Sequence, residues 1–248
     1  MKNLDHEFAK IIRGKRVSVV GPAAYMQGSG FGKVIDDSDV VIRINRSHES
    51  TSEYGADIGY RTDVLYSCLI EKPENAGKVD LKDLQEKGIK CICAPPASDM
   101  KGYASSTKFS QLVDMNKINR ISEQILVRLV DHKFHTEIAS KINCRPNTGF
   151  LLIFDVLRFQ PEVLNIYGFS FYLDGFVTGT KLGIESSGLT EDTFAKKCFN
   201  SKRHKQENMW NYAKKELPQM ENVFLDPVLG KILSMNTFSQ DEFRRLYA

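Results

Sequence analysis

Residues 15–63 read KRVSVVGPAAYMQGSGFGKVIDDSDVVIRINRSHESTSEYGADIGYRTD, and this stretch predicts the fold. A short apolar strand over residues 17–20 ends at Gly21, and a second over residues 40–44 ends at Asn45. Apolar strands separated by a helix are typical of a parallel sheet in an α/β protein. The loop and short helix between the two strands contain three glycines, Gly28, Gly30 and Gly32.

These strand ends and glycines also predict a binding site. Ligands of open parallel sheets bind beyond the carboxyl ends of the strands, where Gly21 and Asn45 lie. Glycines let backbone N–H groups approach an anion, and a following helix adds a positive dipole end. The stretch therefore predicts a nucleotide or phosphate site, and a glycine-rich surface loop without ligand is the alternative. Gly21 is followed by Pro22, so no G-x-G-x-x-G fingerprint opens the first turn, and no G-K-[ST] of a P-loop follows.

A second informative block, residues 145–172, reads RPNTGFLLIFDVLRFQPEVLNIYGFSFY. Asn, Thr and Gly at 147–149 can cap and open a helix over residues 150–159, and such caps expose N–H groups that suit a phosphate. A buried strand over residues 163–167 ends at Gly168. This block therefore predicts a third strand end and a helix start at the same site.

The first block resembles the large sialylmotif of the eukaryotic-type sialyltransferases, glycosyltransferase family 29. The matching positions are Val19, Val20, Gly21, Gly28, Ser29, Gly30, Gly32, Lys33, Ile35, Asp36, Asp39, Val41, Arg43 and Asn45, and residues 55–59 resemble the A-D-V-G that follows in the family. The second block resembles the small sialylmotif at Pro146, Thr148, Gly149, Tyr167, Gly168 and Phe169, with Asn147 in place of a Ser. Both cysteines of the disulfide that joins these motifs in lumenal members are absent, with Val17 and Pro161 in their places.

The resemblance implies an α/β fold. We expect a single Rossmann-like domain over residues 1–248, with a mostly parallel twisted sheet flanked by helices, as a variant of the GT-A fold. Within it the large-motif-like part spans 16–63, the small-motif-like part 145–172, and a His-containing motif 203–210.

Elsewhere the pattern makes several local predictions. Residues 46–59 are interpreted as a polar loop. An apolar stripe predicts a helix over residues 118–130, with His132 and His135 at its end in a structural role. Residues 97–109 and 173–189 are predicted to be flexible loops, and the basic stretch 196–205 is interpreted as a solvated face or as an attractor of an anionic substrate.

Composition restricts the function classes. The chain has 248 residues, 42% hydrophobic and 26% charged, and its net charge of +3 is too small to imply a nucleic-acid partner. No apolar run reaches the about 20 residues that span a bilayer, and residues 1–16 contain no signal-peptide core. Peripheral membrane contact stays open. The five cysteines show no paired framework, so we expect a cytoplasmic protein, of prokaryotic or viral type or lacking its anchor.

The resemblance implies a transferase that moves sialic acid from CMP-sialic acid to a hydroxyl of a glycan or glycolipid acceptor. We expect an inverting reaction without cofactor or metal, because the CMP leaving group is already an anion. The chain also lacks a loop-borne D-x-D: the acidic run Asp36, Asp37 and Asp39 is interpreted as structural. A CMP-Kdo-dependent transferase and an inactive CMP-binding module are the two alternatives, the latter because Pro22 replaces a nucleotide-binding Asn of the family.

The predicted donor-binding residues are Gly21, Asn45, Asn147, Thr148, Gly149, Gly168 and Phe169. Since Pro22 donates no hydrogen bond, the backbone of Ala23 or Ala24 is expected to replace it. His204 is the predicted general base, because it is a late histidine after a loop and resembles the family's His followed by a Glu. Two residues rather than four separate it from Glu207, and His48 is the second choice.

Overall fold

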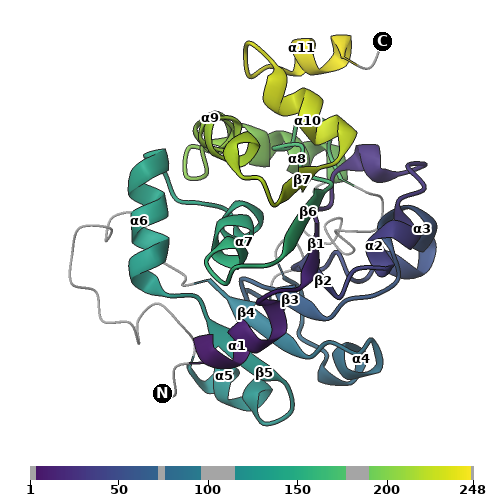
Figure 1. Cartoon of the computed structure of the whole chain (residues 1–248), viewed down its shortest axis with the longest axis vertical. Helices are drawn as coiled ribbons and strands as arrows, with labels where there is room; N and C mark the ends of the chain where they lie inside the picture. The colour runs from purple at the N-terminus through teal and green to yellow at the C-terminus, as the bar shows by residue number, and fades with distance from the viewer. Residues whose placement is uncertain (1–3, 72–75, 96–114, 177–189, 247–248) are drawn as a thin grey trace.

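The computed structural model describes residues 4–71, 76–95, 115–176 and 190–246. Its centre is a seven-stranded sheet in the order β5-β4-β3-β2-β1-β6-β7, and all six strand pairings are parallel (Figure 1). The strands are β1 (Arg16–Val20), β2 (Val40–Ile44), β3 (Val64–Tyr66), β4 (Cys91–Ala94), β5 (Leu126–Leu129), β6 (Val163–Tyr167) and β7 (Val223–Leu225). The predicted α/β fold with a parallel sheet flanked by helices is therefore confirmed.

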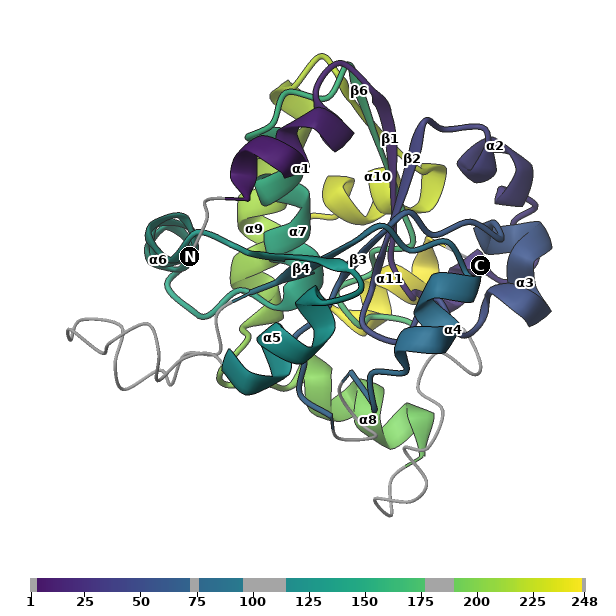
Figure 2. The ribbon, with the colours of Figure 1, turned by 90° about the horizontal axis from the view of Figure 1, so that it is seen from below.

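Helices cover both faces of this sheet (Figures 1 and 2). One face carries α2 (Gly32–Asp36), α3 (Thr51–Ile58), α4 (Leu81–Glu86) and α5 (Met115–Ser122). The other carries α1 (Asp5–Ile12), α6 (His132–Ile142), α7 (Thr148–Leu157), α9 (Gln206–Glu216) and α10 (Pro227–Ser234). Four further elements are η1 (Ala24–Met26), α8 (Glu191–Phe199), η5 (Leu217–Gln219) and α11 (Gln240–Arg245). No helix of the described ranges is both long and apolar enough to cross a membrane.

Alternating side chains of each strand supply two cores. Val17 and Val19 of β1 belong to the large core beneath α1, α7 and α9, whereas Val20 belongs to the smaller core beneath α2 and α3. Leu65 of β3 likewise joins the core beneath α4 and α5, while Val64 faces the large core. Because both faces are buried, the strands read as continuous apolar runs rather than alternating ones.

The order of the strands places the binding edge. The chain proceeds from β1 to β5 in one direction, then returns to the other side of β1 with β6. Such a reversal opens a crevice at the carboxyl ends of the two strands beside it. Val20 pairs with Tyr167 at the last position of both strands, so Gly21 and Gly168 follow side by side.

Buried polar contacts attach helix α7 to the sheet. The carboxylate of Asp155 is fully buried and accepts hydrogen bonds from Arg128 Nη1 at 2.6 Å and from the hydroxyl of Tyr66 at 2.8 Å. Arg128 lies on β5 and Tyr66 on β3, so these bonds tie α7 to two strands. Burial of a carboxylate without such hydrogen-bond partners would be strongly unfavourable.

Two sequence predictions about local structure are wrong. The stripe over residues 118–130 is divided between α5 and β5, because residues 126–129 pair with β4. Ile118 and Ile121 of α5, Ile125 of the turn and Val127 of β5 all reach the same core, which produced the apparent stripe. His132 and His135 consequently lie at the start of α6, where Asp131 accepts a hydrogen bond from Lys133 N, and not at a helix end.

Residues 46–59 are likewise not a loop, since they contain α3. The helix was not predicted because it buries only Thr51, Gly55 and Ile58, so the segment has a polar composition. The predicted loop over residues 97–109 and most of that over residues 173–189 lie outside the described residues.

Candidate active site

A cavity of about 250 Å³ opens at the carboxyl ends of the strands. Its walls come from the segments that follow β1, β2, β3 and β6, from the start of α7, and from α8 with the loop that leads to α9. Ligands of open parallel sheets bind at this carboxyl edge, beside the point where the strand order reverses.

Most of the predicted site residues meet in this cavity. The ones that line it are Asn45, Asn147, Thr148, Gly149, Gly168, Phe169 and His204. They come from three separate regions of the chain, at Asn45, at residues 147–169 and at His204, and the fold brings those regions together.

Gly21 is different, because it is a packing residue and not part of the lining. A Cβ atom on Gly21 would lie 2.2 Å from the carbonyl oxygen of Gly168, and its N–H donates to Tyr167 O at 2.7 Å. Pro22 and Ala23 line the cavity instead. The N–H of Ala23 already donates to Gly168 O at 3.0 Å, and Ala24 is not among the lining residues. The Ala23 amide is therefore already bonded in this structure, and the replacement of the Pro22 donor by the backbone of Ala23 or Ala24 stays a prediction.

Asn45 ends β2 in a left-handed conformation, with φ of 47°. Its Oδ1 accepts a hydrogen bond from Cys68 N at 3.0 Å, which holds the side-chain amide in one orientation. The Nδ2 group is then available as a donor to a ligand, because an amide offers separate donor and acceptor ends.

The start of α7 supplies donors of a different kind. Asn147 caps the helix, with Oδ1 accepting from Phe150 N at 2.8 Å. The N–H groups of Thr148 and Gly149 precede that bond and have no intrahelical partner, so they form the positive end of the helix dipole. Gly149 allows this end to approach the sheet, since a Cβ there would lie 3.0 Å from Ile44 Cδ1.

His204 faces this helix start from the loop between α8 and α9. Its Nδ1 lies 2.9 Å from the backbone oxygen of Arg145, so Nδ1–H donates and Nε2 carries the lone pair. Burial lowers the pKa of His204 to about 4, which makes the ring neutral at pH 7. Glu207 is exposed in the first turn of α9, and the partner of the imidazole is the Arg145 carbonyl instead.

The charge of the lining is one-sided. Arg145 and Arg203 contribute to it, and none of the lining residues within the described ranges is Asp or Glu. Arg145, Tyr172 and His135 were not predicted as site residues. Arg145 opens the second block, two residues before the cap Asn147, and Tyr172 closes that block, so position could have indicated both. Burial lowers the pKa of His135 to about 3, so this ring is also neutral at pH 7.

The glycine loop binds an anion, but the anion belongs to the protein. The carboxylate of Asp57 on α3 accepts hydrogen bonds from Gly28 N at 2.8 Å and from Gly30 N at 2.9 Å. Gly28 and Gly30 have φ of 77° and 69°, which glycine adopts without strain. The interpretation of these glycines as part of a phosphate site is therefore wrong: they attach the loop to α3.

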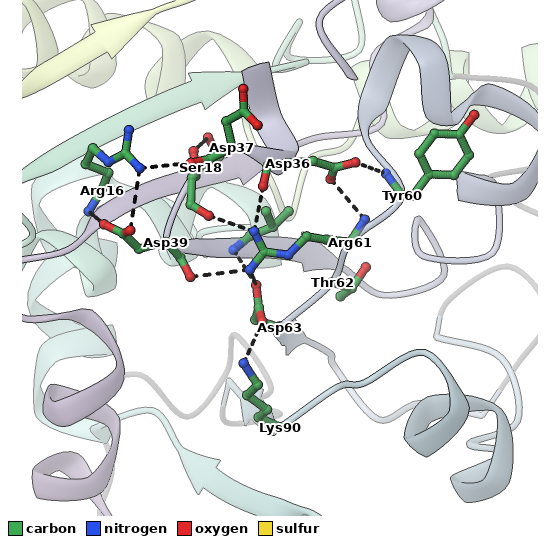
Figure 3. A network of polar contacts seen from close by, with 12 residues as sticks. Arg16, Ser18, Asp36, Asp37, Asp39, Tyr60, Arg61, Thr62, Asp63 and Lys90 are labelled. Carbon is green, nitrogen blue, oxygen red and sulfur yellow. Dashed lines mark hydrogen bonds and ion pairs between the residues drawn. The ribbon is translucent and has the colours of Figure 1, made fainter. Parts of the chain in front are cut away.

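The acidic residues of the same block form a network at the opposite, amino ends of the strands (Figure 3). Asp36 accepts from Tyr60 N at 2.8 Å and from Arg61 N at 3.0 Å, and Asp39 accepts from Arg16 N at 2.8 Å. Arg61 and Lys90 both donate to Asp63, each at 2.9 Å. Asp36 and Asp39 therefore connect strand starts, in agreement with the structural role predicted for them. Within the described part of the chain no group of three His, Cys, Asp or Glu side chains is placed to hold a metal ion.

Arg43 of β2 connects the sheet to the end of α3. Its guanidinium is fully buried and donates to the carbonyls of Ile58 at 2.6 Å and Gly59 at 2.8 Å. Burial lowers its pKa to about 10. Of the first block, only Pro22, Ala23, Ile44 and Asn45 reach the cavity; the rest builds the frame.

A comparison with protein families decides the assignment. The family profile described as glycosyltransferase family 29 (sialyltransferase) matches residues 5–175. The chain belongs to glycosyltransferase family 29. Glycosyl transfer of the sialyltransferase type is thus the activity of its class, and the resemblance seen in the two blocks is confirmed. A search of curated protein sequences finds no significant match.

Solved structures of sialyltransferases have the same fold as this family 29 protein. A mammalian sialyltransferase in complex with Gal-beta-1-3GalNAc-ortho-nitrophenol is 17% identical with a TM-score of 0.53, over 88% of this chain and 71% of that one. CstII from Campylobacter jejuni, in complex with the substrate analogue CMP-3FNeuAc, is 15% identical with a TM-score of 0.50, over 90% of both chains. A tyrosine-to-phenylalanine variant of CstII in complex with CMP is 14% identical with a TM-score of 0.53, over 91% of this chain and 88% of that one.

Proposed function

We propose that this protein transfers sialic acid from CMP-sialic acid to a hydroxyl of a glycan or glycolipid acceptor, with inversion and without a metal ion. The observation that carries the proposal is the one-sided charge of the cavity. Two arginines, two neutral histidines and a helix start line it, and no carboxylate does within the described ranges. An acidic sugar joined to a nucleoside monophosphate brings two negative charges, which this lining would attract.

The helix start is the expected phosphate site. The N–H groups of Thr148 and Gly149 and the hydroxyl of Thr148 would bind the phosphate oxygens. Nδ2 of Asn45 and the backbone beside Gly168 would bind the ribose or the base. The CMP and CMP-3FNeuAc complexes of the structures with the same fold are consistent with a donor of this class.

His204 is the proposed general base. The bond from its Nδ1–H to Arg145 O leaves Nε2 to accept the proton of the acceptor hydroxyl. The pKa of about 4 results from burial and from the nearby positive charges of Arg145 and Arg203. A bound donor would add negative charge beside the ring, and we expect this charge to raise the pKa toward neutrality, where a general base is most effective.

The leaving group supports the absence of a metal in this proposal. CMP departs as a phosphate monoester whose charge the helix start and the arginines would stabilise. We also expect a cytoplasmic location, because all five cysteines are free thiols.

The decisive experiment is a screen of CMP-sugars with product detection by mass spectrometry, including CMP-sialic acid and CMP-Kdo, with and without acceptor and in EDTA. We expect CMP release from CMP-sialic acid, with turnover unchanged by EDTA. Turnover of CMP-Kdo but not of CMP-sialic acid would indicate a CMP-Kdo-dependent transferase instead. Loss of turnover in EDTA with recovery on magnesium or manganese would reject the metal-independent reaction, and tight CMP binding without any turnover would indicate a binding module.

A further inference from the structure

The segment that follows β6 contains a turn at the wall of the cavity proposed to bind the donor (the donor cavity). Leu173 N donates to Ser170 O at 3.0 Å, which closes a four-residue turn with Phe171 and Tyr172 at its centre. Both central residues have positive φ, 53° and 63° respectively. Both also line the donor cavity, so the shape of this turn shapes the proposed site.

The backbone of this turn is strained. Positive φ at both central positions of a turn is usual for glycine, asparagine or aspartate, and side chains with a bulky Cβ substituent adopt it at a cost. Here both positions carry aromatic residues, Phe171 and Tyr172. Strain of this kind persists where the surrounding structure holds it, and it is concentrated at functional sites. The contacts at the two ends of the turn therefore decide whether it keeps its shape.

Tyr25 of η1 makes a hydrogen bond at each end of the turn. Before the turn, its hydroxyl oxygen accepts from Phe169 N at 3.1 Å. After the turn, Asp174 Oδ2 accepts from the main-chain N–H of Tyr25 at 2.7 Å. The ring of Tyr25 packs against both the large core and the core beneath α2 and α3, which fixes its position. Tyr25 itself is not among the residues that line the cavity.

Asp226, the buried N-cap of α10, orients the hydroxyl of Tyr25. The hydroxyl donates to Asp226 Oδ2 at 2.7 Å, and the same oxygen accepts from Gly168 N at 2.9 Å. The other oxygen, Oδ1, accepts two N–H groups of the first turn of α10, each at 2.8 Å. Because the Tyr25 proton points to Asp226, the lone pairs of its oxygen remain for Phe169 N. A chain of hydrogen bonds thus runs from α10 through Tyr25 to the turn.

We propose that Tyr25 is a positioning residue of the transferase, which holds both ends of the strained turn so that Phe171 and Tyr172 are correctly placed for the donor. The proposal rests on the function proposed above, because the turn acts at the donor cavity. Without the hydroxyl of Tyr25, the turn of the free protein would populate other conformations. The apparent affinity for the donor would then fall by the fraction of molecules in the binding conformation, whereas turnover at saturation would not.

The test compares two tyrosine variants. Tyr25→Phe and Tyr66→Phe each remove a hydroxyl that donates to a buried aspartate, at 2.7 and 2.8 Å. In Tyr66→Phe, Asp155 keeps its bonds from Arg128, so α7 stays attached to the sheet. Tyr25→Phe should raise the Kd for CMP and the donor KM about tenfold, with kcat within about twofold of the parent. Tyr66→Phe should bind CMP as the parent does. Asp174→Ala releases the other end of the turn and should raise the same two constants.

An unchanged Kd for CMP in Tyr25→Phe would overturn the proposal. An equal rise in Tyr66→Phe would also overturn it, because the effect would then follow from lost stability and not from the position of the turn. A loss of kcat at unchanged donor KM would contradict a role in placing the turn before the donor binds.

Amide hydrogen exchange separates these failures from failure of the proposed function, because it needs no substrate. The amides of Phe169 and Leu173 should exchange about tenfold faster in Tyr25→Phe than in the parent or in Tyr66→Phe. Equal exchange rates would reject the hold on the turn even if the enzyme is active. Faster exchange in Tyr25→Phe, together with a parent that binds no CMP, would support the hold and reject the proposed function.

Discussion

Gly21 and Gly168 lie against each other at the carboxyl ends of β1 and β6, and neither has room for a side chain. A Cβ on Gly21 would lie 2.2 Å from the oxygen of Gly168, and a Cβ on Gly168 would lie 2.5 Å from the oxygen of Gly21. Because the obstacle is backbone in both cases, no rotamer change can relieve it. This close approach lies at the point where the strand order reverses, and Gly168 lines the cavity there.

Gly21→Ala should therefore destabilise the protein by about 1–3 kcal/mol, the usual cost of overpacking. The matched control is Gly230→Ala in α10, where an added Cβ would meet nothing within 4 Å. That change should stabilise by roughly 0.5–1 kcal/mol, because glycine is unfavourable inside a helix. Urea unfolding of the three proteins measures both effects. Equal stabilities of parent and Gly21→Ala would show that the two strand ends can separate.

Asp57→Ala should loosen the glycine loop without touching the cavity. It removes the acceptor of the Gly28 and Gly30 N–H groups, and we expect a loss of about 2 kcal/mol because both bonds are charge-assisted. Glu53→Ala, one turn earlier on α3 and exposed, is the control and should be near neutral. Thermal unfolding gives the stabilities. An unchanged Tm together with a loss of CMP binding would instead indicate that the glycine loop binds the phosphate.

Asn45→Ala and Thr148→Val should weaken CMP binding, each by roughly tenfold for the loss of one hydrogen bond to the nucleotide. Thr136→Val on α6 is the control, because its hydroxyl donates to His132 O outside the cavity. Isothermal titration calorimetry with CMP compares the four proteins. If both site variants bind CMP as tightly as the parent, the nucleotide lies elsewhere.

His204→Ala should lower kcat by about 10²–10⁴ while the affinity for CMP stays near that of the parent, as expected for loss of a general base. His132→Ala is the matched control, since that histidine is exposed at the start of α6 and does not line the cavity. Steady-state kinetics and CMP titration together make the distinction. Unchanged turnover in His204→Ala would assign the histidine a structural role and direct attention to His48.

Stability should fall in acid because the pKa values of two cavity histidines, buried His135 and partly buried His204, are lowered in the folded protein. The pKa of His204 is lowered to about 4 and that of His135 to about 3, whereas an unfolded histidine titrates near about 6.5. Between these values the unfolded state binds more protons than the folded one, so the free energy of unfolding decreases as pH falls from about 6.5 toward 4. Urea unfolding at several pH values measures this slope. It should be shallower in His204→Ala than in the parent, and an identical slope would contradict the lowered pKa.

The sequence by itself determined the family and most of the frame. The strand over residues 163–167 and the helix starting at the Asn147 cap could be predicted because apolar runs and caps are local signals. Seven of the eight predicted site residues line one cavity, since a motif at a strand end points to the binding edge of any parallel sheet.

Only the tertiary structure decided which of those residues face a ligand. The glycines of the loop looked like anion binders, and the anion proved to be Asp57, which lies 27 residues from Gly30 and packs there through the arrangement of α2 and α3. The division of residues 118–130 into α5 and β5 depended on pairing with β4, a contact no local pattern contains. His135 lines the cavity because α6 packs beside α7, a contact between separate helices that local sequence could not place.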